Sequence, residues 1–420
     1  MKHTILASTS VLALALSPVA ALAVDKAAVV ENYADIAEAG YGDSLIAARA
    51  MGEAVDAFIA APSAETLQAA KDAWLAARVP YQQTEVYRFG NAIVDDWEGK
   101  VNAWPLDEGL IDYVDGGEAS DENPYAVMNI VASTTLEVSG TTIDATEITA
   151  ELIEELHELD EIEANVTTGY HAIEFLLWGQ DLNGTGPGAG ERPWSDYASG
   201  DACTNGNCDR RAQYLKVVTD LTISDVEWMA NAWKEGGEAR AELMAKGPSG
   251  GIQTILTGMG SLSYGEQAGE RMKLGLMLND PEEEHDCFAD NTHNSHYYDG
   301  LGIRNVYHGR YVRIDGSVVE GPSLSDLVAA ADTGVDTRLT LALHETMQAL
   351  GAIKTAAEAG MKYDMMLDPA NEVGGALIET AVQALVGQTR EIERAVAALG
   401  LNEIAFEGSD SLDNPSAVFQ

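Results

Sequence analysis

Apolar residues recur at steps of three and four along most of the chain, the spacing of one buried stripe on an α-helix. In residues 147–159 this stripe consists of Ile148, Leu152, Ile153, Leu156 and Leu159. The same spacing marks the ranges 50–60, 64–87, 209–244, 339–353 and 376–399. Strand-like alternation is confined to short pieces such as residues 311–314, which we expect to form a hairpin around Asp315-Gly316. The pattern predicts an all-α fold with at most a small β-hairpin.

Two stretches lack the helical spacing. Residues 183–209 are rich in Gly and Pro, a composition that favours turns, so we place a domain boundary near residue 200. Residues 279–321 carry four of the eight histidines and predict a long irregular segment, which in a compact domain usually serves a function. We therefore expect an N-terminal helical domain over 24–200, a C-terminal helical bundle over 201–405 and a tail over 406–420.

The first residues have the pattern of a signal peptide. Lys2 precedes an apolar run over residues 5–16, and small residues lead up to Ala23. The apolar run is shorter than the roughly 20 residues that a membrane-spanning helix needs. We expect cleavage after Ala23 and an exported protein of the periplasm or cell envelope, without a membrane span in its mature form.

The composition narrows the possible partners. The formal net charge is −44, from 24 basic and 68 acidic residues, and such a surface repels nucleic acid. Hydrophobic residues still make up 46% of the chain, enough to fill the cores of ordinary domains. The charge therefore argues against a nucleic-acid partner and not against a globular fold.

Three cysteines offer one close pair. Cys203 and Cys208 lie five positions apart in a polar stretch, and exported thiols at such spacing usually form a disulfide. A zinc site at the same two residues is the alternative, but the chain has no second close pair to complete four thiolate ligands. The remaining Cys287 is explained by burial alone.

A histidine and a glutamate three positions apart form the most informative motif. His171 and Glu174 lie in the run Gly169-Tyr170-His171-Ala172-Ile173-Glu174. On a helix they share one face, so an imidazole and a carboxylate can converge on one cation. The spacing alone fits equally a core histidine that is satisfied by a backbone carbonyl.

The residues around this pair resemble the imelysin-like family, whose motif is Gly-x-His-x-x-Glu. Residues 78–88, 102–107 and 284–293 are also similar to that family, and the resemblance extends over nearly the whole mature chain. It implies two all-helical domains, the second an up-and-down four-helix bundle, with the functional site near their interface. It also links the chain to bacterial iron uptake.

The resemblance implies a larger ligand set. In related iron-uptake proteins a glutamate and an aspartate upstream join the His-x-x-Glu pair, and the matching positions here are Glu85 and Asp107. Glu108 is adjacent, so the second match stays open. Three carboxylates and one imidazole suit iron, manganese or zinc, and we expect iron or another such divalent metal as the cofactor.

Other residues of the family-like segments are expected beside this site. Arg88 offers either an anchor for an anionic chelate or a buried ion pair. Polar residues of the 284–293 segment either add ligands or stabilise a long loop. The full set of expected lining residues is Tyr81, Arg88, Trp104, Glu284, His285, Asp286, Asp290 and His293.

These patterns favour a protein that binds a metal ion or metal chelate and delivers it to an iron-transport component of the envelope. A metallopeptidase that uses the same site is the alternative, because a His-x-x-Glu pair with a third ligand also holds zinc in some peptidases. His344-Glu345 begin like a zincin helix, but Gln348 occupies the position of the second histidine. We expect no catalytic residues. An adhesive or polysaccharide-binding module is a further alternative.

Overall fold

The computed structural model describes residues 24–116, 120, 123–402 and 404–419. The predicted signal peptide, residues 1–23, lies outside this part of the chain. Helices dominate the described residues, in which the only sheets are two antiparallel two-stranded hairpins. The predicted all-α fold is confirmed. None of the described helices combines the length and hydropathy that crossing a membrane requires.

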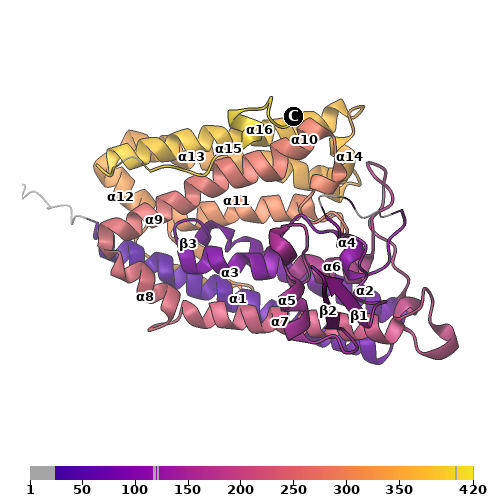
Figure 1. Ribbon diagram of the computed structural model, residues 1–420. Coiled ribbons are helices and arrows are strands. Elements are labelled where there is room, and N and C mark those ends of the chain that lie inside the picture. The colour runs from indigo at the N-terminus through magenta and orange to yellow at the C-terminus, as the bar shows by residue number, and fades with distance from the viewer. Residues whose placement is uncertain (1–23, 117–119, 121–122, 403, 420) are drawn as a thin grey trace, which may run out of the picture.

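One group of helices forms around the first long helix, α1 (Lys26–Ala60). Asp25 caps α1 by accepting from the Ala27 amide, and Ser63 and Thr66 form a capping box at the start of α2 (Ala64–Gln82). α1 packs along α2 and along α7 (Cys208–Ala232), and both of these contact α6 (Gly169–Trp178). In Figure 1 these helices lie on the lower side of the molecule, with their axes roughly aligned.

Shorter elements join α2 to α6. They are η1 (Glu85–Tyr87), α3 (Ala92–Asn102), α4 (Glu108–Ile111), β1 (Thr135–Val138), β2 (Thr141–Asp144), α5 (Ala150–Leu156) and η2 (Leu159–Glu161). The hairpin β1–β2 is a feature that the hydrophobic pattern did not predict. Its turn contains Ser139 and Gly140, both with positive φ, and only one face of β1 is buried. The strands are too short for a clear alternation.

The Gly- and Pro-rich segment before α7 contains two short 3-10 helices, η3 (Trp194–Tyr197) and η4 (Gly200–Ala202). Cys203 and Cys208 form a disulfide there, with an S–S distance of 2.00 Å, and α7 begins at Cys208. Although α7 follows residue 200, it packs against α1. The domain boundaries over 24–200 and 201–405 stay a prediction.

Four long helical segments form a second group, on the upper side in Figure 1. The first is continuous, from α9 (Gly247–Ser261) through the π-helix η5 (Leu262–Lys273) to α10 (Leu274–Leu278). The others are α11 (Thr292–His308), α13 (Thr333–Glu358) and α15 (Glu372–Ala398). Their shared core includes Leu350, Ile353, Ile378 and Leu385. Flanking them are α8 (Glu238–Ala245), η6 (Pro281–Glu283), α12 (Leu324–Ala331), α14 (Tyr363–Leu367) and α16 (Asp410–Asp413).

The region 279–321 is far more regular than its sequence pattern predicts. It contains α11 and the hairpin of β3 (Arg310–Val312) and β4 (Val318–Glu320), which confirms the predicted turn around Asp315-Gly316. The prediction of irregular structure was wrong for α11. Its buried face carries His293, His296 and Asp299, so no apolar stripe marks the helix.

Candidate metal centre

The helix that carries the histidine motif is enclosed on all sides. All ten residues of α6 are buried. Gly169, at its start, has φ +80° and approaches α3 so closely that a Cβ would lie 2.5 Å from the Val101 carbonyl oxygen, which only glycine avoids. The Trp74 Nε1 donates to the Tyr170 carbonyl oxygen at 2.9 Å. These contacts fix α6 and turn its polar side chains into the interior.

The two residues of the motif contact each other. The distance from His171 Nδ1 to Glu174 Oε2 is 2.9 Å, and the other oxygen, Glu174 Oε1, accepts from the Ala289 amide at 2.9 Å. His171 Nε2 is buried and has no hydrogen-bond partner among the described residues. Glu174 therefore contacts the Nδ1 atom of His171, which is also the ring nitrogen that faces Asp286.

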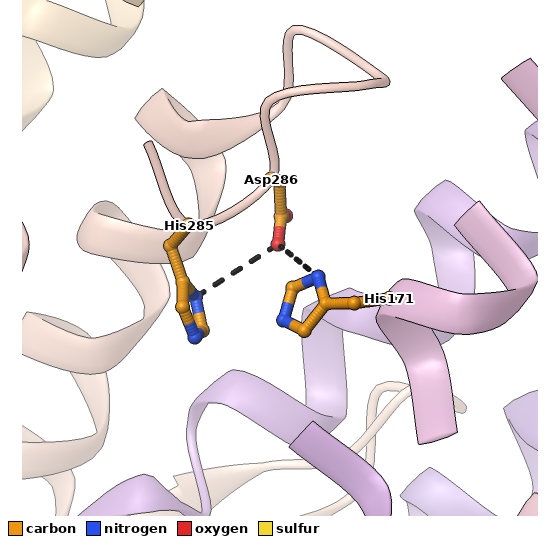
Figure 2. A group of neighbouring side chains, drawn as sticks. All are labelled: His171, His285 and Asp286. Carbon is orange, nitrogen blue, oxygen red and sulfur yellow. Dashed lines mark ion pairs between the residues drawn. The ribbon is translucent and has the colours of Figure 1, made fainter. Parts of the chain in front are cut away.

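A second histidine and an aspartate approach this pair from the segment before α11. His171, His285 and Asp286 each offer one donor atom, and these atoms lie within 4.8 Å of one another. Asp286 Oδ1 is 4.0 Å from His171 Nδ1 and 3.9 Å from His285 Nδ1 (Figure 2). Asp286 Oδ2 accepts instead from Asn291 and Ser295. One oxygen of Asp286 is thus turned toward both imidazoles.

A buried arginine also contacts this group. Arg78 donates to Asp286 Oδ1 at 2.8 Å and to Asn102 Oδ1 at 2.6 Å. Its guanidinium lies 3.5 Å from His285 Nδ1. Burial alone would raise the pKa of Asp286, but Arg78 and the hydrogen-bond donors around the carboxylate lower it below its usual value. Asp286 is therefore a stable anion at the centre of the group.

The other donors are uncharged in the absence of a cation. Burial raises the pKa of Glu174 well above its usual value, and repulsion by Asp286 raises it further. Burial and the nearby arginines lower the pKa values of His171 and His285, which keeps both imidazoles neutral. Neutral imidazoles and deprotonated carboxylates are the forms that bind metal ions, and a bound cation would favour ionisation of Glu174. The donors fit a metal ion such as iron, manganese or zinc.

A cavity of about 850 Å³ reaches this group from the surface. His285 and Trp104 are among its lining residues, and the Trp104 ring also packs against His171 with a centroid distance of 5.1 Å. Acidic residues predominate over basic ones in its wall: Asp95, Asp96, Glu98, Glu158, Glu163, Glu266, Glu270 and Glu283 face Arg88, Lys100 and Arg271. Such a wall attracts cations toward the histidines.

Residues 37–392 match the family described as Imelysin (peptidase M75). The chain belongs to the imelysin family. It is 22% identical over 357 residues to the iron-regulated protein A of Synechococcus elongatus, a match that covers 83% of this chain and 79% of that protein.

A crystal structure supports the same fold. The putative iron-regulated protein A precursor of Parabacteroides distasonis superposes with a TM-score of 0.62 at 20% identity, and the match covers 89% of this chain and 95% of that one. At this identity the likeness shows that the imelysin fold is shared, and it assigns no residue a role.

Glu85, expected as a ligand from the imelysin resemblance, lies in an ion-pair network of its own. Arg271 in the π-helix donates to Glu85 Oε2 at 2.7 Å, and it also contacts Glu266 at 2.8 Å and Asp299 at 3.2 Å. Glu85 does not belong to the donor group around His171. Arg88 contacts Asp95 and Glu266 from a side chain that is 25% exposed, so these ion pairs are only partly buried.

Asp107 is also apart from the donor group. It precedes α4, its amide donates to the Ala164 carbonyl oxygen, and its side chain accepts from Asn123. Tyr81 packs against Tyr170 with a ring-centroid distance of 4.9 Å, as part of the core. The assignment of Asp107 and Glu85 as ligands stays a prediction from the family resemblance.

The polar residues of the 284–293 segment lie in different places in the structure. His285 and Asp286 join His171, whereas Asp290 approaches Asp181 and Asp364. Glu284 and His293 are buried but belong to neither donor group. Arg78 was missed as a site residue, although it begins one of the family-like segments. Its charge, on the mostly apolar buried face of α2, was the feature that could have identified it.

Proposed function

We propose that the protein binds a metal ion through His171, His285 and Asp286, with Glu174 as a further ligand. One observation carries the proposal: three donor atoms from two distant segments lie within 4.8 Å of one another, and all three side chains are buried. Burying polar and charged groups side by side is unfavourable in free energy, and a bound ion would offset that cost. Arg78 would share Asp286 with the ion, since a carboxylate has lone pairs for both.

Iron is the metal that we propose. Imidazole and carboxylate ligands suit iron, manganese and zinc, so the donor set does not choose among them. The choice rests on the relatives, whose names are iron-regulated protein A and its putative precursor. We further propose that the protein is exported, that the ion or a small chelate enters through the acidic cavity, and that an envelope iron-transport component receives it.

The test is metal binding by single-residue variants. His171→Ala and His285→Ala should each weaken Fe²⁺ binding at least tenfold, about 1.4 kcal/mol, because each removes a ligand. His344→Ala is the matched control, since His344 is exposed on α13. Affinity is measured by competition with a chromogenic chelator, and helical content by circular dichroism. If the affinity for Fe²⁺ is unchanged in both variants, the donor group around His171 is not the metal-binding site.

A metallopeptidase is the second candidate, because the cavity reaches His285, a member of the donor group. Hydrolysis would need an open coordination position and a separate general base. Glu98 is buried in the cavity wall, where burial and repulsion from Glu85 raise its pKa to about 7, and it would be that base.

A further inference from the structure

Three carboxylates from distant parts of the chain meet away from the histidines. Asp181 follows α6, Asp290 precedes α11, and Asp364 lies in α14, which is at the same end of the molecule as α6 (Figure 1). Each offers an oxygen within 4.8 Å of the other two. Asp290 is 4% exposed and Asp364 is 2% exposed, whereas Asp181 is partly exposed. We call Asp181, Asp290 and Asp364 the aspartate cluster.

The buried oxygens of the aspartate cluster lack hydrogen-bond donors. Among the described residues, Asp290 Oδ1 and both carboxylate oxygens of Asp364 are shielded from solvent without a hydrogen-bond partner. A buried charged group without a partner is strongly unfavourable, so such groups usually pair with a cation. The neighbouring Glu284 is 1% exposed, both of its oxygens are also unpartnered, and its charge repels that of Asp364.

The protein supplies little positive charge at this place. Among the described residues, Lys362 is the cation that acts on Asp290 and Asp364, and its Nζ lies 3.5 Å from the Asp290 backbone oxygen. Burial, followed by mutual repulsion, raises the pKa of Asp290 to about 6 and that of Asp364 to about 7, even though Lys362 opposes the rise. Full ionisation of the aspartate cluster is therefore unfavourable without a cation, and a bound cation would favour it.

We propose that the aspartate cluster is a binding site for a hard divalent cation, specifically Ca²⁺. Its donors are all carboxylate oxygens, the ligands that Ca²⁺ prefers, whereas the donor group around His171 includes two imidazoles. Ca²⁺ binds oxygens at about 2.3–2.6 Å, so opposite ligands can be about 5 Å apart. Mg²⁺ needs shorter distances and a regular octahedron, which a cluster from three separate segments meets less easily.

A cation at this site would connect parts of the chain that no covalent bond joins. It would tie the loop after α6 and the segment before α11 to α14 in the second group of helices. The site shares no residue with the donor group of His171 and does not depend on the proposed function. Its role would be structural, because the bound form of the fold gains stability from the ion.

The test uses the full chain, freed of metal with a chelator and then titrated with Ca²⁺. We expect one Ca²⁺ to bind by isothermal titration calorimetry and the melting temperature to rise. Asp364→Asn and Asp181→Asn should each weaken Ca²⁺ binding at least tenfold. Asp181 is partly exposed, so its variant tests the site even if the core substitution disturbs folding. Glu345→Gln, which removes an exposed acid on α13, is the matched control.

Two results would overturn the proposal. One is a wild-type chain that binds no stoichiometric Ca²⁺, and the other is affinity that is unchanged in both aspartate variants. The His171→Ala variant separates this proposal from the proposed function. It should lose Fe²⁺ binding and keep its response to Ca²⁺, whereas loss of both responses would place the Ca²⁺ at the histidine group.

Discussion

Arg78 connects α2 to the candidate metal centre through a single buried guanidinium. It donates to Asn102 and Asp286, and it lies over the rings of Trp74 and Tyr170 at 5.5 and 5.2 Å. Only 1% of the residue is exposed. A cation buried so deeply needs its carboxylate partner, and the partner needs the cation equally. Arg78 thus fixes the position of Asp286 whether or not a metal ion is bound.

We expect Arg78→Ala to destabilise the metal-free protein by about 3–5 kcal/mol, because it leaves the Asp286 charge buried without its partner. Arg49→Ala is the matched control. Arg49 pairs with Glu227, the two side chains are 52% and 48% exposed, and such a surface pair contributes less than about 1 kcal/mol. Urea unfolding followed by circular dichroism measures both. Equal losses in the two variants would show that the buried pair has no special importance.

Single residues show what sequence reasoning could and could not predict. The shared face of His171 and Glu174 follows from helical spacing, and the structure has the 2.9 Å contact. The pairing of Glu85 with Arg271 could not be predicted, because 186 positions separate the partners. Local spacing carries no information about contacts of that range.

Among the elements, several helices with apolar stripes were predicted, whereas α11, which lacks such a stripe, was missed, and so was the segment from α9 to α10. α13 and α15 bury regular rows of leucine, isoleucine and valine, whereas α11 buries histidines, glycines and Asp299. Gly302 of α11 approaches the Gln83 backbone so closely that a Cβ would be 2.5 Å from its carbonyl oxygen. At Gly302 the residue type is determined by contact with a neighbouring backbone and not by hydrophobicity.

The helix α7 allows a prediction about pH. Burial raises the pKa of Asp225 to about 6, with a smaller contribution from Glu154. The unfolded chain has a lower pKa, so the folded state holds more protons between about pH 4 and 6, and stability falls as the pH rises through that window. Asp225→Asn should therefore stabilise the protein at pH 7 by about 1 kcal/mol, a value reduced for partial solvent exposure.

The gain from Asp225→Asn should vanish below about pH 4, where the aspartic acid is neutral in both states. Thermal unfolding between pH 4 and 7 measures it. Asp220→Asn, on the surface of the same helix beside Lys216, should show no such dependence. A gain of the same size at every pH would mean that the substitution acts through something other than the charge of Asp225.

The disulfide between Cys203 and Cys208 lies at the start of α7. The bond closes a loop of only a few residues, so the double Cys→Ser variant should lose no more than about 2 kcal/mol of global stability. After alkylation without reduction, we expect mass spectrometry to find Cys203 and Cys208 unalkylated, because their sulfurs are bonded to each other. Labelling of all three cysteines in the native protein would contradict the bond.

At the scale of the whole molecule, the candidate metal centre joins residues from α6 and from the segment before α11. The all-α class could be predicted from the apolar stripes, and the family resemblance implied a four-helix bundle as the second domain. The meeting of His171 with His285 could not, because it depends on how the two groups of helices pack. The pattern of a single sequence predicts contacts within one helix, but it does not predict contacts between residues that are far apart along the chain.

We predict that the protein is not a peptidase. The four proposed ligands around His171, two imidazoles and two carboxylates, would fill a tetrahedral zinc site and leave no open position for water. His344 lies exposed on α13 without a second zincin histidine. Protein loaded with zinc or iron should leave a peptide library uncut, as judged by mass spectrometry. Cleavage that is lost in both His171→Ala and Glu98→Gln would establish the hydrolase. Cleavage that survives both would indicate a contaminating protease.

The donors of the candidate metal centre are separated by more than one hundred positions, from His171 to His285. No part of the chain short enough to emerge early can assemble them, since bringing such distant residues together has an entropic cost that only packing repays. Metal uptake would then report that folding is complete. A nascent or partly unfolded chain would pass through a metal-rich compartment without capturing an ion, and cargo would be taken up only by finished molecules.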